Sequence, residues 1–108
     1  MTLPNVYELV GALEGMGKEV AANTILRTRV FETGVIRFRK VKPPSGNRVV
    51  HREKDVLCLV LSGAGMLHAG TKVQAVKRGD LCYIPKGVEH DFMAAKRELS
   101  LFYILLRA

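Results

Sequence analysis

Residues 79–90 read GDLCYIPKGVEH, with a glycine, a proline, a second glycine and a histidine at fixed offsets. Gly79-Asp80 predicts a tight turn that tolerates positive φ. Leu81 to Ile84 predicts a buried strand, and Pro85-Lys86-Gly87 predicts the next turn. His90 then opens the following strand, from which an imidazole can project into the space that the strands enclose. The stretch therefore predicts strand, turn and strand, with one inward histidine.

This spacing resembles the second motif of the cupin superfamily, G-x5-P-x-G-x2-H-x3-N. Every position through His90 matches, and the last position is Ala94 in place of asparagine. The resemblance implies an all-β fold, the double-stranded β-helix or jelly-roll barrel of the cupins. It also implies a metal or small-molecule site inside that barrel.

The rest of the chain fits a small β-barrel. Residues 4–14 carry apolar side chains at helical spacing, which predicts a short N-terminal helix. From residue 23 onward, short β-rich runs alternate with turn residues, which is typical of a sandwich or barrel. The runs are 24–31, 34–42, 48–51, 56–62, 65–69, 72–76, 81–84, 90–94 and 98–106, and the breaks between them include Thr33-Gly34 and Gly63-Ala64-Gly65. We expect a single domain over 1–108, helical over 1–22 and barrel over 23–108.

Composition favours one small cytoplasmic protein. The chain has 108 residues, which is enough for one hydrophobic core. Hydrophobic residues make up 48% of it, a larger share than is typical of disordered chains. No apolar run approaches the roughly 20 residues of a membrane span, and the N-terminus lacks a signal-peptide pattern. Cys58 and Cys82 lie in apolar runs, which favours buried free thiols over a disulfide. Residues 98–106 and the N-terminal helix offer more apolar surface than one barrel can hide, so we expect a homodimer.

The first cupin motif, G-x5-H-x-H-x3-4-E-x6-G, is matched only in part. If Gly63 is the closing glycine of the motif, counting back places its two histidines at Val49 and His51, and its glutamate at Val56. If Gly46 is the opening glycine instead, counting forward brings His51 near the position of the first histidine, and Glu53 takes the position of the second. Asp55 lies one residue before the position expected for the glutamate in the first count. Both counts place His51 on a ligand position, and they differ elsewhere.

These residues suggest a metal site. Alternate residues of a strand point to the same side, so two histidines in an H-x-H pair can hold one ion. Imidazole and carboxylate ligands suit Fe, Mn, Ni, Cu or Zn. The candidates here are His51, His90 and one of Glu53 or Asp55, a two-histidine, one-carboxylate set of the kind that non-haem iron oxygenases use. The opposing interpretation is a metal-free barrel with packed histidines and a solvated charged loop over 52–55.

A small-ligand pocket is expected around the histidines. The residues expected to line it are Val49, Val56, Cys58, Val60, Phe92 and Ala94. Such a wall is apolar with a few polar atoms at one end, as in most small-molecule sites, and its desolvation would hold both imidazoles neutral. Tyr83 and Tyr103 are candidates for a hydroxyl at the rim.

Positive charge is concentrated in one part of the sequence. The net charge is +7, and nine basic residues against two acidic ones lie between Arg27 and Lys54. Such a stripe can attract an anionic small molecule, although exposed strand edges are often basic simply to prevent aggregation. No aromatic residues alternate with the basic ones as platforms for single-stranded nucleic acid require, so nucleic acid is not favoured as a partner.

Two classes of function stay open. One is a binding module, in which the pocket holds a divalent metal ion, a small and possibly anionic molecule, or both, without turnover. The other is a metal-dependent enzyme of dioxygenase or isomerase type, with His51 and His90 as ligands. The sequence has no distinct general acid or base beyond the candidate ligands and no nucleophile motif, which weakens the enzyme hypothesis. The sequence therefore favours a single-domain binding protein.

Overall fold

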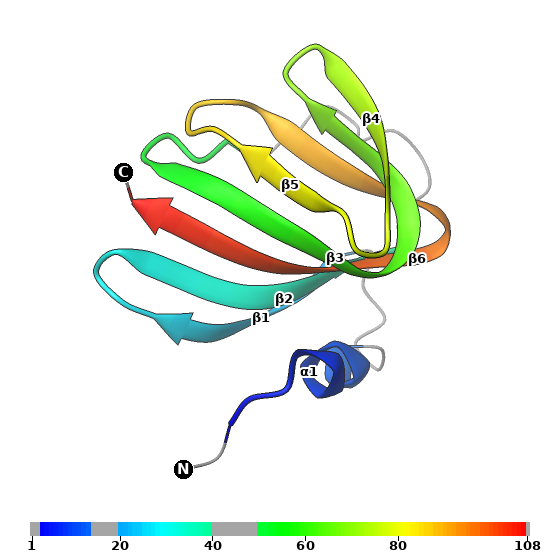
Figure 1. Ribbon diagram of the computed structural model, residues 1–108, viewed down its shortest axis with the longest axis horizontal. Helices are drawn as coiled ribbons and strands as arrows, with labels where there is room; N and C mark the ends of the chain where they lie inside the picture. Colours follow the sequence, from blue (N-terminus) through cyan, green and yellow to red (C-terminus); the bar gives the residue numbers. More distant parts are fainter. Residues whose placement is uncertain (1–2, 14–19, 40–49, 108) are drawn as a thin grey trace.

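The structure, a computed structural model, describes residues 3–13, 20–39 and 50–107. In this part of the chain one short helix precedes a six-stranded antiparallel sheet (Figure 1). The elements are α1 (Val6–Leu13), β1 (Val20–Arg27), β2 (Phe31–Phe38), β3 (Lys54–Ala69), β4 (Lys72–Lys77), β5 (Leu81–Ile84) and β6 (His90–Arg107). The predicted fold class, all-β with a short N-terminal helix, is confirmed.

The long strands β3 and β6 form the centre of the sheet and pair with each other over most of their lengths. The strand order is β1-β2-β6-β3-β4, and β5 pairs with β3. The first half of β3 lies between β5 and the end of β6, whereas its second half lies between β4 and the start of β6. Because both long strands bend midway, the sheet folds over itself into two layers (Figure 1).

The bend in β3 lies at Gly63 and Gly65, where its register against β6 shifts. Gly63 has a φ of +82°, a conformation that residues with a side chain rarely adopt. A Cβ on Gly63 would overlap the carbonyl oxygen of Glu98, and one on Gly65 would overlap that of Met93. The two glycines therefore allow β3 and β6 to approach closely where the sheet turns over.

The strand breaks predicted at Gly63–Gly65 and at Thr33-Gly34 are wrong, because both segments lie inside continuous strands. The predicted runs on either side of Gly63–Gly65 join as β3, and the runs 90–94 and 98–106 join as β6. Gly34 lies inside β2, and a Cβ there would overlap the hydroxyl of Tyr103 on β6. These glycines therefore reflect close approach between strands rather than turns.

The N-terminal boundaries also differ from the prediction. β1 begins at Val20, so the end of the segment 1–22 is strand rather than helix. The run 24–31 is split by a turn, in which the Thr28 hydroxyl accepts hydrogen bonds from two later N–H groups. The run 48–51 lies partly outside the described residues, and its last two residues are not in a strand.

The hydrophobic core has two parts. The larger part lies between the two layers of the folded sheet, and its buried residues are Phe38, Val56, Cys58, Val60, Leu67, Val76, Cys82, Ile84, Phe92, Ala94, Leu99, Leu101 and Leu105. Both of its cysteines are free thiols. The smaller part lies between α1 and the sheet, and consists of Val10, Leu13, Ala21, Val35 and Leu61.

Helix α1 is anchored at both ends. At its start the side-chain oxygen of Asn5 accepts hydrogen bonds from the N–H groups of Tyr7 and Glu8, as in a helix N-cap. At its end the buried side chain of Arg37 donates a hydrogen bond to the carbonyl of Leu13, and a positive charge there also complements the helix dipole.

Among the described residues no helix is long and apolar enough to cross a membrane.

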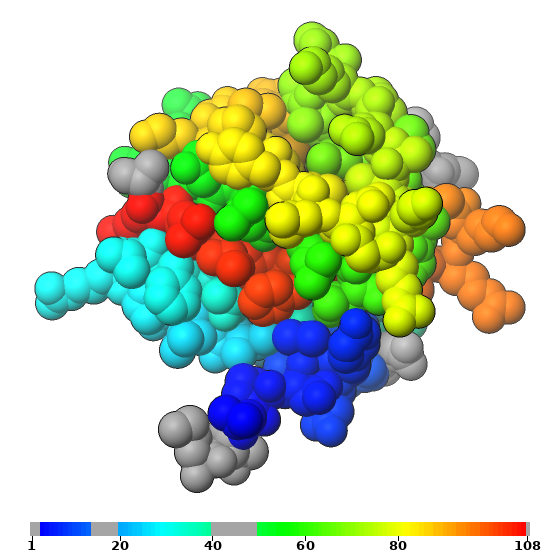
Figure 2. Space-filling model, viewed as in Figure 1, coloured from blue at the N-terminus to red at the C-terminus, as the bar shows by residue number. Residues whose placement is uncertain are grey.

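Strand β5 is half exposed rather than buried as predicted. Its even-numbered residues are buried, whereas Leu81 and Tyr83 are 70% and 59% exposed. Leu81 pairs with Leu59 of β3, and Figure 2 shows β5 and neighbouring parts of β3 uncovered on the face beside α1. The segment 98–106, in contrast, buries Leu99, Leu101 and Leu105 in the core. The homodimer, expected from the apolar surface of residues 98–106 and the N-terminal helix, stays a prediction.

Replacement of Gly63 by alanine is expected to lower the free energy of unfolding by about 2 kcal/mol or more, since the new Cβ needs an unfavourable φ and overlaps Glu98. Gly11→Ala is the matched control. Nothing lies within 4 Å of a Cβ at Gly11, and alanine there should stabilise α1 by up to about 1 kcal/mol. Urea denaturation measures both effects. A Gly63→Ala protein as stable as the parent would contradict this account of the bend.

Candidate functional site

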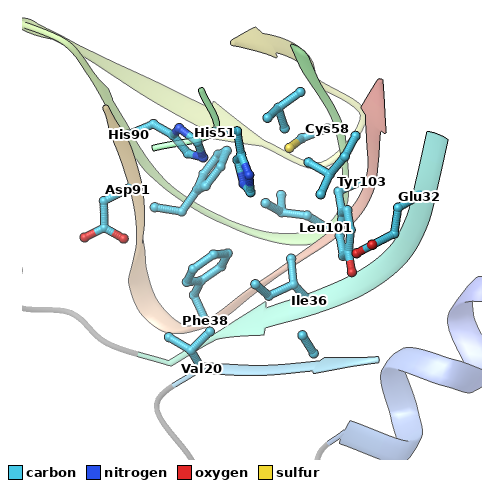
Figure 3. Close-up of a pocket in the computed structure, with 14 residues that line it drawn as sticks. Val20, Glu32, Ile36, Phe38, His51, Cys58, His90, Asp91, Leu101 and Tyr103 are labelled. Atoms are coloured by element: carbon cyan, nitrogen blue, oxygen red, sulfur yellow. The ribbon is translucent and has the colours of Figure 1, made fainter. Parts of the chain in front are cut away.

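The folded sheet encloses a cavity of about 440 Å³ (Figure 3). Its apolar lining residues are Val20, Ala22, Ile36, Phe38, Val56, Phe92, Leu101 and Leu105. Its other lining residues are Glu32, His51, Cys58, His90, Asp91 and Tyr103. The volume and the mostly apolar wall are those of a site for a small organic molecule.

His51 and His90 meet at this cavity, although they come from distant parts of the sequence. His90 is the first residue of β6 and is buried, and His51 lies in the loop before β3 and is half-buried. Their ring centroids are 5.6 Å apart and their planes are inclined by 30°. Both rings face the cavity from the same side (Figure 3).

The turn over residues 85–88, between β5 and β6, positions both histidines. The N–H of Gly87 donates a 2.8 Å hydrogen bond to the carbonyl oxygen of His51. The Nδ1 of His90 lies 3.2 Å from the carbonyl oxygen of Val88. Because a carbonyl only accepts, Nδ1 carries the proton in this contact. In the neutral ring the Nε2 of His90 is then a bare acceptor.

The pKa of His51 is lowered from 6.5, first because the ring is buried and then because His90 and Lys54 bring positive charge near it. The carboxylate of Glu32 acts in the opposite direction and is the weakest of the four influences. His51 is therefore neutral at pH 7. A neutral imidazole both donates and accepts a hydrogen bond, and it is also the form that binds metals.

Neither carboxylate that was predicted as a third ligand lies with the histidine pair. Asp55 accepts a 2.9 Å hydrogen bond from the N–H of Lys86, and its contact with Tyr83 raises the pKa of that phenol after the effect of desolvation. Glu53 is exposed and does not line the cavity. Asp91 does line it, but its carboxylate points away from the two imidazoles (Figure 3).

The donor set for a metal is therefore incomplete in the part of the chain that the structure describes. No three side chains of His, Cys, Asp or Glu type come close enough there to hold one ion. Zinc sites in proteins commonly use three or four protein ligands, whereas His51 and His90 supply two. The three-ligand site that the resemblance implies has no geometric support here, and metal binding stays a prediction.

The predicted pocket residues divide into three groups. Val56, Cys58 and Phe92 line the cavity. Val60 and Ala94 are buried in the same core cluster but lie outside the cavity wall. Val49 lies outside the described residues.

The sequence interpretation missed the walls that β1, β2 and the second half of β6 contribute. The missed residues of these walls are Val20, Ala22, Glu32, Ile36, Phe38, Leu101 and Leu105. Asp91 at the start of β6 was also missed, whereas Tyr103 was already a candidate for the rim. The alternation of residues 101, 103 and 105 was a usable signal, since alternate residues of a strand share a side. No comparable signal marks residues 20 and 22, because the sequence predicts helix for the segment 1–22 that contains them.

A pH titration followed by NMR should find the midpoint of His51 below 6.5. Lys54→Gln should raise that midpoint, because it removes a positive charge that disfavours the imidazolium. Lys72→Gln, on the exposed face of β4, is the control and should leave it unchanged.

The same shift predicts how stability depends on pH. The unfolded chain takes up a proton at His51 near pH 6.5, whereas the folded chain does so only at lower pH. The contribution of His51 to the free energy of unfolding is therefore full above pH 6.5 and falls as the pH drops toward the folded pKa. A midpoint at or above 6.5 would contradict both expectations.

Comparison with known proteins points to one family. A family model described as a cupin domain matches residues 39–105. An uncharacterized protein of Aquifex aeolicus (strain VF5) is 28% identical over 99 residues, which cover 92% of this chain and 78% of that protein.

Solved structures agree with this match at the level of the fold. A cupin-2 domain containing protein from Shewanella frigidimarina NCIMB 400 has a TM-score of 0.76 at 19% identity, covering 97% of this chain and 95% of its own. A conserved protein with a double-stranded β-helix domain from Klebsiella pneumoniae subsp. pneumoniae MGH 78578 has a TM-score of 0.79 at 19% identity, covering 99% and 90%.

Proposed function

The chain belongs to the cupin family, and we propose that it binds a small, largely apolar molecule in its barrel cavity. The observation that carries the proposal is the convergence of two imidazoles, His51 and His90, on a mostly apolar cavity of about 440 Å³. In this proposal the cavity wall holds the body of the ligand and the imidazoles hold a polar group at one end.

The apolar wall supplies the affinity. Burial of apolar ligand surface is worth about 25 cal/mol per Å², so a ligand that buries about 200 Å² against these side chains gains about 5 kcal/mol before the costs of association. Side chains such as Leu101 and Phe92 are themselves buried in the core. The wall is therefore held in place by packing before any ligand arrives.

The two imidazoles supply orientation. The Nε2 of His90 is available to accept a hydrogen bond from a ligand hydroxyl or amide, because Val88 accepts the proton of Nδ1. Neutral His51 beside it offers a second donor or acceptor. Tyr103 lies across the cavity from the pair (Figure 3), so its hydroxyl is a candidate contact for the other end of the ligand.

The uncharged fluorophore N-phenyl-1-naphthylamine tests the cavity. We expect it to bind the native protein with one site per chain. Ala22→Trp, which places an indole in the cavity wall, should weaken binding by about tenfold or more, a change of about 1.4 kcal/mol.

Val73→Trp is the matched control, because Val73 is 55% exposed on β4 and does not line the cavity. It should leave the affinity of the fluorophore within about twofold. Circular dichroism checks that both variants are folded. Equal binding by the two variants, or no binding to the native protein, would reject the proposed function.

Transition-metal binding by the histidine pair is a second candidate function. It is favoured by one observation, the bare Nε2 of His90 beside a neutral His51. Because the described residues supply two ligands and not three or four, we expect a weak site that loses its metal on dialysis.

Thermal denaturation with added Ni²⁺ or Zn²⁺ tests this candidate. A weak site predicts a rise in Tm that is lost in His90→Ala and kept in His68→Ala, since His68 does not line the cavity. Near-stoichiometric metal in untagged protein after dialysis against a chelator would contradict a weak site. The absence of any Tm shift with either ion would reject metal binding by the pair.

A further inference from the structure

We infer that the ligand of the cavity is an amphipathic anion, whose acidic group is held by Arg29, Lys54 and Arg107 in a crevice that adjoins the cavity. This inference rests on the proposed function and names the class of ligand that the cavity takes: an apolar body that carries a carboxylate, sulfonate or phosphate at one end.

The crevice is a separate hollow of about 330 Å³. Its lining residues are Arg27, Thr28, Arg29, Phe31, Glu32, Lys54, Leu105 and Arg107. They come from three places in the sequence, namely the hairpin of β1 and β2, the start of β3 and the end of β6. The cations are therefore brought together by the fold and are not a single basic run.

Backbone pairing fixes the three cations relative to one another. Lys54 is the register partner of Arg107 across β3 and β6. The N–H of Arg107 also donates a 2.9 Å hydrogen bond to the carbonyl oxygen of Val30, which follows Arg29 in the turn. The crevice thus has a built frame, even though its cationic side chains reach into solvent.

The crevice and the cavity share part of their walls. Glu32 and Leu105 line both hollows. In Figure 3 Glu32 lies beside Tyr103, across the cavity from the histidine pair. A molecule whose body fills the cavity with one end at His51 and His90 can therefore present its other end to the crevice.

The charge of the crevice is unbalanced. Arg27 and Glu32 neutralise each other through an ion pair of 2.8 Å. Arg29, Lys54 and Arg107 form no ion pair with any residue that the structure describes. Three like charges on one concave surface repel each other, and an anion among them relieves that repulsion. Guanidinium groups also bind carboxylate, sulfonate and phosphate oxygens in a bidentate manner.

A basic strand edge that only prevents aggregation would account for exposed lysines and arginines. It would not account for their arrangement around a hollow that shares Glu32 and Leu105 with the apolar cavity. The shared wall is the feature that favours a ligand with both an apolar and an acidic part.

Two fluorophores with the same apolar body test the inference. 8-Anilino-1-naphthalenesulfonate is N-phenyl-1-naphthylamine with one added sulfonate, so the difference between their affinities isolates the acidic group. In the double variant Arg29→Gln/Arg107→Gln, the affinity for the sulfonate should fall by about tenfold or more, and that for the uncharged probe should stay within about twofold. Added KCl should weaken the binding of the sulfonate probe and leave that of the uncharged probe unchanged, because salt screens exposed charges.

The matched control is Lys96→Gln/Arg97→Gln, which removes the same net charge from exposed positions on β6 outside the crevice. It should change neither affinity by more than about twofold. An equal loss of sulfonate binding in both double variants would mean that net charge alone attracts the probe, and would overturn the inference. Sulfonate binding that Ala22→Trp does not weaken would also overturn it, because the probe would then lie outside the cavity.

The outcomes separate this inference from the proposed function. One outcome is that Ala22→Trp blocks binding of the uncharged probe, while binding of the sulfonate does not depend on Arg29 and Arg107. That outcome would support ligand binding in the cavity and reject the anion site. No binding of the uncharged probe, together with sulfonate binding that depends on the two arginines, would reject the cavity as an apolar site and the amphipathic ligand with it.

Discussion

The site depends on one backbone turn, residues 85–88, and on the hydrogen bonds that it makes in three directions. Its Gly87 N–H holds the carbonyl of His51, and its Val88 carbonyl holds the ring of His90. Its Lys86 N–H is held by Asp55 at the start of β3. The spacing of the two imidazoles is therefore set mainly by main-chain geometry, which a substitution in the cavity wall leaves intact.

The turn can do this because β3 and β6 are long and bent. Because β3 and β6 pair antiparallel, the start of β6 lies opposite the end of β3, and the end of β6 lies opposite the start of β3. The bends place the two halves of each strand in different layers (Figure 1). The space between the layers becomes a cavity whose wall is supplied by inward-facing residues of β1, β2, β3 and β6. The same folding brings the end of β6 against the β1–β2 turn, where the cationic crevice forms.

Much of this was predictable from residues 79–90, because turn chemistry and strand alternation are local properties. The turns, the position of His90 at the start of a strand and the meeting of His90 with His51 are as expected. Asp55 was a plausible ligand by spacing, but spacing does not report that its carboxylate faces the N–H of Lys86. The sequence predicts turns at Gly34 and Gly63, because a glycine that permits close strand contact cannot be told by its identity from one that permits a turn.

The thiols of this protein have a practical consequence. Cys58 lies in the cavity wall as the cross-strand partner of Cys82, and burial, with a smaller effect of Cys82, raises the pKa of Cys58 to about 12. At neutral pH Cys58 therefore carries almost no thiolate, the form that alkylating reagents attack. Burial also raises the pKa of Cys82. A cysteine introduced on the surface would therefore react first with a maleimide dye, and the protein can be labelled at a chosen position without replacing either native sulfur.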